Sequence, residues 1–530
     1  MTNQETITRQ GLRAVNLWLK GKDEWILWVE KAPIASVSFE GVDFSKHINH
    51  KGNISFQGYK FPKGDVSFRG AKFGEGDVNF RQAEFKYGVV NFSQAEFKYG
   101  VVNFNEATFG KGNVDFSGAS FGEGDVDFSQ AEFEKGDVSF NEAYVIKGNV
   151  SFNCANFGEG DVSFNETNFG EGDVSFYGAK FGEGDASFTE TNFGEGYVDF
   201  SQAEFKKGYV DFNGAKFGEG DVDFSQAEFE KGDVNFGGAS FGGGVVDFSR
   251  AEFKKGNVFF NWANFGEGDV DFSLAEFKKG DVDFSGASFG GGDVDFSEAK
   301  FGEGEVRFEH FIFHGNADFS DLRGCDAVNL FSFKNVSFEK TFVISGDFGC
   351  VVDMVGTKTS HHMELSGLKC HLQRKCLWGF FKKSNDKKDA ARLRRLKELA
   401  EKNKHHEAAL RFHANEMRAK RWHETGLIAS CQDMIFSGIS DYGQSIWRPV
   451  AGLVLLTFFF PFVADTSLKF WEFMSLPIEK EMVKEALRNS LPFLPASRSI
   501  LSSITSILHQ LVAIIFIFLI GLGLRNRFRV

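Results

Sequence analysis

The stretch VDFSQAEFKKGYVDFNGAKFGEGDVDFSQAEF, residues 198–229, repeats one pattern of phenylalanine. Its rings stand five and seven residues apart in turn, at Phe200, Phe205, Phe212, Phe217, Phe224 and Phe229. Phe accounts for 67 of the 530 residues of the chain, so the pattern dominates the composition. Self-similarity at a fixed period is typical of repeat architectures and is read before any other feature.

The repeating unit is 12 residues long and can be followed from Phe56 to Phe313. With few exceptions, Val stands two residues before the first Phe of a unit and Ala two residues before the second. Residues at i and i−2 lie on one side of an extended segment, so the polar residue between them faces water. This spacing fits no helical stripe. The sequence therefore predicts a mainly β fold, a parallel β-solenoid over residues 37–350.

The repeat is compatible with two lengths of coil, 12 and 24 residues. A 12-residue coil would have to bury two rings in a very thin interior. After residue 200, AEF followed by Lys or Glu alternates with a variant followed by Gly, which is a 24-residue superperiod. Duplication of a double unit is the other explanation of that alternation. We prefer the 24-residue coil, which predicts that Phe200 stacks on Phe224 and not on Phe212.

The rings and their small neighbours are the predicted core. The residues expected to be buried are Phe200, Phe205, Phe212, Phe217, Phe224, Phe229, Val198 and Ala203. Rings stacked at the strand spacing of about 4.8 Å would offset the entropy of ordering the chain. Gly stands four residues before the first Phe of every unit, where we expect it to supply the φ freedom of a corner.

The [AV]-x-F-x-x units resemble those of bacterial pentapeptide-repeat proteins. The resemblance implies a right-handed quadrilateral β-helix. Two further residues follow every second pentapeptide, so the chain departs from the family pattern, and we expect two enlarged corners in each coil.

The composition changes on both sides of the repeats. Residues 1–36 are predicted to form an N-terminal helical cap, residues 351–386 an irregular cap or linker, and residues 387–445 a basic helical connector with a break at Asn403–His405. The repeats themselves are acidic, within a net charge of −14 for the chain.

Residues 446–530 are predicted to be a membrane module with two transmembrane helices, at about 447–466 and 505–524, that form a hairpin. A buried core helix is the alternative for each. The stretch SDYGQSIWRP and the terminal FLIGLGLRNRFRV resemble the carboxy-terminal membrane module of many bacterial pentapeptide-repeat proteins.

Basic residues predict the orientation of this module. Arg448, Arg525, Arg527 and Arg529 flank the two apolar segments. By the positive-inside rule, the solenoid and both termini should be cytoplasmic, in a multi-pass protein of the cell (inner) membrane. His509 and Gln510 should lie near the start of the second span, where headgroups solvate them. An N-terminus without an uninterrupted apolar core predicts no signal peptide, and six Cys in a chain of this length favour a reducing compartment.

No pattern of catalytic or metal-binding residues stands out. The recurring GEGDVDF resembles the turns of calcium-binding toxin repeats, but those need a nine-residue period, so we interpret it as glycine corners with solvated carboxylates. The residues His361, His362, Cys370, His371 and Cys376 include zinc-binding types at a spacing that matches no standard site. Nucleophile-elbow, phosphate-loop and dinucleotide motifs are missing from the sequence. We predict no enzyme, no metal and no cofactor.

The expected function is therefore non-catalytic. A cytoplasmic acidic solenoid, anchored to the lipid bilayer, would serve as a scaffold for an unknown protein partner. The first alternative is a subunit of a channel or transporter, with homo-oligomers formed through the transmembrane helices. The second alternative is a DNA-mimicking protein that binds a topoisomerase. Nucleic acid itself is not expected as a partner.

Overall fold

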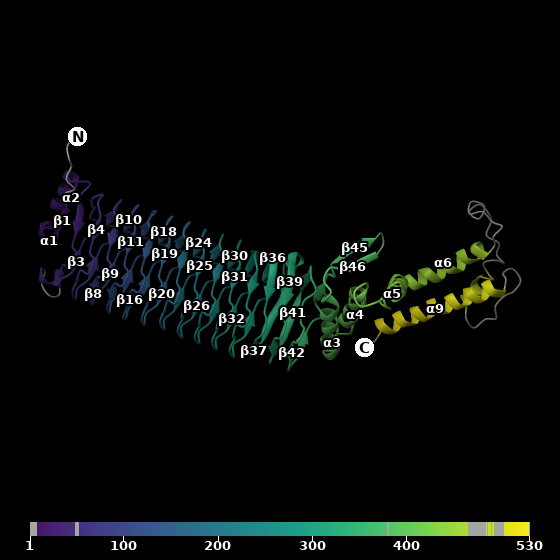
Figure 1. Ribbon diagram of the computed structural model, residues 1–530. Coiled ribbons are helices and arrows are strands. Elements are labelled where there is room, and N and C mark those ends of the chain that lie inside the picture. Colours follow the sequence, from purple (N-terminus) through teal and green to yellow (C-terminus); the bar gives the residue numbers. More distant parts are fainter. Residues whose placement is uncertain are drawn as a thin grey trace, which may run out of the picture. The chain divides into compact units, whose positions relative to one another are not determined.

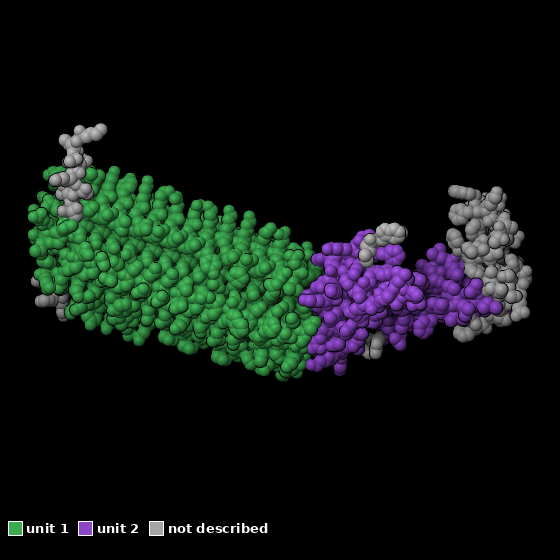
Figure 2. Space-filling view, viewed as in Figure 1, with its two compact units in different colours: residues 1–371 green, residues 372–530 purple. Residues whose placement is uncertain are grey.

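The computed structural model describes residues 8–47, 52–378, 381–464, 484, 486–488, 490–491 and 503–528. The chain forms two compact units, residues 1–371 and 372–530 (Figure 2). The first unit is a parallel β-solenoid of about 15 turns, and helices make up most of the second (Figure 1).

Each turn of the solenoid contributes to four parallel ladders, in which paired residues lie 24 positions apart. Along the turn that begins at Val198, ladder 1 contains Val198, ladder 2 Glu204, ladder 3 Val210 and ladder 4 Lys216. Most strands are only two residues long, because the polar position and the corner that follow interrupt each extended segment.

The strands of ladder 1 pair in chain order. They are β3 (Ile54–Ser55), β5 (Val78–Asn79), β9 (Val102–Asn103), β13 (Val126–Asp127), β17 (Val150–Ser151), β20 (Val174–Ser175), β23 (Val198–Asp199), β26 (Val222–Asp223), β29 (Val246–Asp247), β32 (Val270–Asp271), β35 (Val294–Asp295), β38 (Ala317–Leu322), β41 (Phe342–Phe348) and β43 (Met363–Glu364), with β44 (Leu368–Cys370) also on β41.

Ladders 2 and 3 share the long strand β36 (Lys300–Arg307). Ladder 2 contains β6 (Glu84–Phe85), β10 (Thr108–Phe109), β14 (Glu132–Phe133), β18 (Asn156–Phe157), β21 (Lys180–Phe181), β24 (Glu204–Phe205), β27 (Glu228–Phe229), β30 (Glu252–Phe253), β33 (Glu276–Lys279) and β36. Ladder 3 contains β1 (Thr8–Gln10), β2 (Ser36–Ser38), β4 (Val66–Ser67), β7 (Val90–Asn91), β11 (Val114–Asp115), β15 (Val138–Ser139), β19 (Val162–Ser163), β22 (Ala186–Ser187), β25 (Val210–Asp211), β28 (Val234–Asn235), β31 (Val258–Phe259), β34 (Val282–Asp283), β36 and β39 (Val328–Ser332).

Ladder 4 is the least regular. Its strands are β8 (Glu96–Phe97), β12 (Ser120–Phe121), β16 (Tyr144–Val145), β37 (Ile312–Phe313), β40 (Ser337–Phe338) and β42 (Lys358–Thr359). Between β16 and β37, single bridges from Asn168 through Ser288 continue the pairing.

The rings settle the length of the coil. Phe200 lies face to face with Phe224, with centroids 4.8 Å apart and planes 1° apart. Phe212 instead meets Phe200 edge-on at 5.4 Å across the interior. The 24-residue coil is therefore confirmed and the 12-residue coil excluded. All the residues named as core are buried: Phe200, Phe205, Phe212, Phe217, Phe224, Phe229, Val198 and Ala203.

The N-terminal end of the stack is closed by α1 (Leu12–Trp18) and α2 (Lys22–Lys31), two helices within the segment predicted to be a helical cap. The indole N–H groups of Trp18 and Trp25 donate to the carbonyls of Ser55 and Lys60, each over 3.0 Å. One coil further along, the equivalent carbonyls, those of Asn79 and Glu84, accept hydrogen bonds from backbone N–H groups of the coil before them. The two Trp side chains therefore take the place of a coil that is missing at this end. Strand β1, which pairs with β2, was not predicted.

The other end of the solenoid extends further than predicted. Strands β42, β43 and β44 continue the ladders to Cys370, and Met354, Met363, Leu365 and Leu368 are fully buried there. Two short 3-10 helices, at Phe44–Lys46 and Cys325–Ala327, lie in corners. The segment 351–386, predicted to be irregular, thus holds the last turn of the first unit and an antiparallel hairpin of the second, β45 (Arg374–Trp378) with β46 (Phe381–Ser384).

The connector consists of α3 (Asp389–Lys402), α4 (His406–Lys420) and α5 (Leu427–Ser440). The break predicted at Asn403–His405 is confirmed, and Lys404 turns the chain there with a φ of 63°. Helices α3 and α4 pack through Leu393, Leu396 and Phe412, which are buried.

Two apolar helices follow, α6 (Trp447–Ala464) and α9 (Ser503–Arg527). Gly452 of α6 lies against the ring of Phe516, and Gly523 of α9 lies against Ile446, just before α6, so the two helices run antiparallel side by side (Figure 1). One segment in the described residues, Ile507–Arg527, is long and apolar enough to cross a membrane, with a mean hydropathy of 2.5 and 22% of its most apolar window buried.

Candidate interaction surface

The outward side of ladder 1 carries a continuous row of aspartates. Six coils in succession place Asp199, Asp223, Asp247, Asp271, Asp295 and Asp318 in register, one above the next. Each is half-buried and accepts a hydrogen bond from the N–H of the Ser two residues later, over 2.6–2.8 Å. We call this row the aspartate ladder.

The aspartate ladder carries its charge without neutralisation. Among the described residues, none of the six carboxylates has a Lys, Arg or His within ion-pair distance. Burial raises the pKa of the Asp247 carboxyl, and the charges of Asp223 and Asp271 on either side raise this pKa further. The row is therefore a concentrated negative strip held at the spacing of the strands.

Replacing Asp247 by Asn is expected to increase the free energy of unfolding by about 0.5–1 kcal/mol at neutral pH. Because the pKa of the folded state is raised, the stability linked to this group is complete below the ordinary pKa of Asp and is lost as the pH rises through the raised value. The gain from the variant should therefore shrink in acidic buffer. Asn79 and Asn103 occupy the same ladder and accept the same backbone hydrogen bond, over 2.8 and 2.9 Å, so the fold tolerates the change.

The matched control is Asp211→Asn on ladder 3. Asp211 lies between Ser187 and Asn235 and accepts a hydrogen bond from the Asn235 side chain over 3.0 Å. Its neighbours in the coils before and after carry no charge, so removing the charge of Asp211 relieves no repulsion and should not increase stability. Urea unfolding of both variants at two pH values measures the difference, and equal effects would contradict repulsion along the aspartate ladder.

Ladder 2 shows the opposite arrangement, because most of its acids are paired. Lys254 lies 2.6 Å from Glu228 and 3.9 Å from Glu252, and Lys278 lies 2.7 Å from Glu252 and 3.1 Å from Glu276. Lys300 extends the alternation at 3.7 Å from Glu276. The net acidity of the repeats is therefore unevenly distributed around the coil.

A second set of carboxylates has a structural task that the sequence analysis missed. At the corner before most V-x-F segments, the side-chain oxygen of an Asp or Asn accepts the backbone N–H of the residue 24 positions later. Asp221 binds the N–H of Val245 over 2.8 Å, and Asp233 that of Asn257 over 2.7 Å. These carboxylates were interpreted as solvated; they also tie consecutive coils together. The steady recurrence of Asp or Asn after the corner Gly was the signal.

An open groove of about 640 Å³ crosses ladder 4 near its start. Its floor is a coil with small side chains, Gly118, Ser120 and Gly122, and its walls include Tyr99 from the coil before and Tyr144 from the coil after. The sequence analysis did not identify it. One coil with small outward residues between two coils with large ones is the pattern that produces it.

The structure places the arginines predicted to orient the membrane module at one end of α6 and α9. Arg448 donates to the carbonyl of Ser437 over 3.2 Å and lies 3.6 Å from Asp441. Arg525 and Arg527 are exposed in the last turns of α9. Asn526, between them, donates to the carbonyl of Gly443 over 3.2 Å, which places that end of α9 beside the start of α6. Arg529 lies outside the described residues.

His509 does not occupy the solvated position that was expected. It is fully buried, and its Nε2 lies 2.9 Å from the hydroxyl of Ser490, which is 2.7 Å from the hydroxyl of Thr457. The expectation was wrong because Ser490 lies against Thr457 of α6 and His509 of α9, a contact that the hydropathy of the sequence does not reveal. The cluster joins three parts of the second unit through polar side chains.

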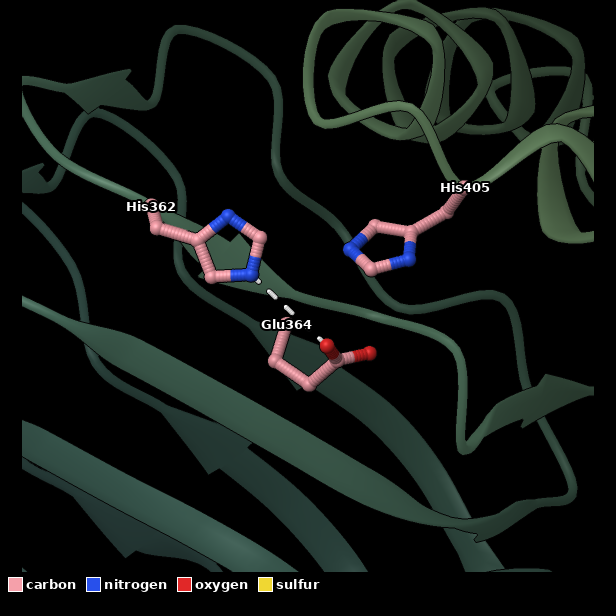
Figure 3. Close-up of side chains that lie close together, drawn as sticks. All are labelled: His362, Glu364 and His405. Carbon is pink, nitrogen blue, oxygen red and sulfur yellow. Dashed lines mark ion pairs between the residues drawn. The ribbon is translucent and has the colours of Figure 1, made fainter.

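The residues considered as zinc ligands have other partners. His362 lies 3.7 Å from Glu364 at β43 (Figure 3), His371 lies 2.7 Å from Asp347, and the His361 ring binds the carbonyl of Glu339. His405, the other side chain drawn there, precedes α4 and belongs to the second unit. Within either unit alone, no three His, Cys, Asp or Glu side chains among the described residues lie close enough together to bind one metal ion.

In comparisons with known proteins, no family model, no curated protein and no solved structure matched this chain.

Proposed function

We propose that this protein is a non-catalytic, membrane-anchored scaffold, whose aspartate ladder is the surface offered to a protein partner. The observation that carries the proposal is the contrast between the two ladders. The ladder 2 acids Glu228, Glu252 and Glu276 are paired with Lys, whereas the stacked acids on ladder 1 are left available to a partner with complementary charge. Complementary charge contributes to specificity and to the rate of association.

The proposed architecture is a right-handed quadrilateral β-helix of the pentapeptide-repeat type, of bacterial origin. Four ladders of short strands with Val or Ala two residues before Phe support it. The antiparallel contact of α6 with α9 supports a two-helix transmembrane hairpin. Exposed Arg525 and Arg527 support an inner-membrane protein with the solenoid and both termini in the cytoplasm.

The test uses the full chain in inside-out and right-side-out membrane vesicles with a crosslinker. A triple variant, Asp199→Asn, Asp223→Asn and Asp271→Asn, should reduce capture of the partner by about tenfold or more. The control, Glu228→Gln, Glu252→Gln and Glu276→Gln, removes the same number of charges from the paired ladder and should leave capture intact. Capture should occur only with inside-out vesicles.

Other results would contradict the proposal. Equal loss in both triple variants would indicate recognition by total charge, as expected of a DNA mimic that binds a topoisomerase. Capture from right-side-out vesicles would reverse the orientation. Extraction of the protein by carbonate would show that it is not anchored by membrane-spanning helices.

The second candidate is a channel or transporter subunit assembled from the hairpins. The buried cluster of Thr457, Ser490 and His509 favours it, because polar side chains among membrane helices often line transport pathways. Conductance of the purified protein in a planar bilayer, together with oligomers that survive in mild detergent, would support this candidate over the scaffold.

A further inference from the structure

Helix α5 has its polarity reversed relative to a helix on the surface of a soluble domain. Its polar residues Ser430 and Ser440 are fully buried, and the side chain of Asp433 is only 12% exposed. Its apolar residues face outward: Leu427 is 71% exposed, Ile428 75% and Ile435 61%. A water-facing surface helix carries the opposite arrangement.

The polar side of α5 is fully engaged inside the connector. Asp433 forms an ion pair with Arg421 and accepts a hydrogen bond from the hydroxyl of Tyr442 over 2.8 Å. Arg421 also donates to that hydroxyl over 2.7 Å. Burial and the hydrogen bond to Asp433 raise the pKa of Tyr442 to about 12, so the phenol keeps its proton and the network stays intact. These contacts fix which side of the helix faces outward.

The outward side is an apolar face with a single polar interruption. Ile428, Ile435 and Ile439 recur at intervals of seven and four residues, which places them on one face of a helix. In this fully described helix, Gln432 is the one polar side chain among them. An exposed apolar face of this kind marks a surface that meets a partner other than water.

Length and position identify the partner. A helix of 14 residues is too short to span a bilayer, and its exposed apolar side excludes a buried core helix. Lipid at the membrane interface or another protein surface could cover this side, and the position of the helix favours lipid. The loop after α5 lies beside the last turn of α9, where Asn526 binds Gly443. Exposed Trp447 and Phe528 are found at the same end with Arg525 and Arg527, and aromatic and basic residues of this kind gather at membrane–water boundaries.

We infer that the apolar face of α5 lies in the membrane interface and contacts lipid, as a collar that holds the connector to the bilayer surface. The inference rests on the proposed membrane anchoring through α9. It adds an apolar lipid-binding surface to a segment that composition identifies only as a basic helical connector. Its apolar side would enter the boundary between headgroups and acyl chains, as amphipathic interfacial helices do.

The test measures depth in the membrane with the full chain, its native cysteines replaced by Ala, in vesicles of phosphatidylcholine and phosphatidylglycerol. Single cysteines at Ile428, Ile435, Glu407 and Phe518 carry an environment-sensitive fluorophore. Iodide quenches from water, and spin-labelled lipids quench from the headgroup level or from the bilayer centre. Phe518 is exposed in the middle of the apolar part of α9, and Glu407 is exposed in the first turn of α4.

The probes at Ile428 and Ile435 should be quenched by the headgroup-level spin label and protected from iodide. The probe at Phe518 should respond to the central label, and the probe at Glu407 to iodide alone. Iodide quenching at Ile428 and Ile435, with Phe518 still in lipid, would overturn the inference and leave the anchor intact. Protection from both quenchers would assign the face to a protein partner or a second copy, which also overturns it. If the probe at Phe518 is not quenched by spin-labelled lipid, both the proposed membrane anchor and the inference for α5 are wrong.

Discussion

Replacing Phe224 with Ala is expected to lower the free energy of unfolding by about 3–5 kcal/mol. The ring is fully buried and stacked 4.8 Å from Phe200 on one side and 4.8 Å from Phe248 on the other. It also meets Phe212 and Phe236 edge-on at 5.4 and 5.3 Å. Since three consecutive coils contribute to this contact set, the cavity cannot close by moving one of them alone. Urea unfolding followed by circular dichroism measures the loss.

The control is Phe259→Ala. Phe259 is the outward residue of β31 and only half-buried, next to the fully buried Phe260. Surface substitutions of this kind usually change stability by less than about 0.5 kcal/mol, and a half-buried ring should stay well below the core value. If the two variants lost similar stability, the ring stack would not be the source of the effect.

Replacing Gly244 with Ala is the second large effect, a loss of about 3 kcal/mol or more. A Cβ at this position would lie 2.4 Å from the carbonyl oxygen and 2.5 Å from the carbonyl carbon of Gly220 in the previous coil. Both are backbone atoms held by the pairing of the coils, so no side-chain rotation relieves the clash. The melting temperature and the yield of soluble protein should both fall.

Its control is the adjacent residue of the same corner. A Cβ on Gly243 would meet only the end of the Glu219 side chain, at 2.6 Å, and that flexible side chain can move away. The equivalent residues one coil before and after are Glu219 and Glu267, so the position already accepts side chains. A Gly243→Ala variant as unstable as Gly244→Ala would contradict the explanation from close approach.

The solenoid and its coil length could be predicted because the information is local and repeated. The two-residue spacing of Val198 and Phe200 reports the side of a strand, and the superperiod after residue 200 reports the coil. The reason for the corner glycines was less accessible. Their φ freedom was expected to matter, yet Gly244 lies outside the left-handed region, and the proximity of the previous coil excludes a Cβ there. That distance depends on the stacking of coils, which no single repeat contains.

The candidate surface was predictable only in its overall charge. Sequence composition shows that the repeats are acidic, but not that Asp247 stacks between like charges while Glu252 is paired with Lys278. Which acids meet depends on the 24-residue offset. In the second unit, the average polarity of residues 387–445 did not indicate the apolar outward side of α5. Asp433 of this helix is held in an ion pair with Arg421, so the exposed side chains of the helix are mainly apolar. In both the solenoid and α5, contacts between residues far apart in the sequence determine which charges remain exposed.

The indole cap at the first coil has a consequence for assembly. A bare end of a parallel solenoid presents unpaired carbonyls in the geometry of the next coil, and a second chain could add there without limit, as in a growing filament. Trp18 and Trp25 occupy two of those acceptors and stack on the first rings, Phe56 and Phe39, so a second coil could not pair with the surface they form. The chain therefore caps this end of its own solenoid, which opposes the addition of a second copy there.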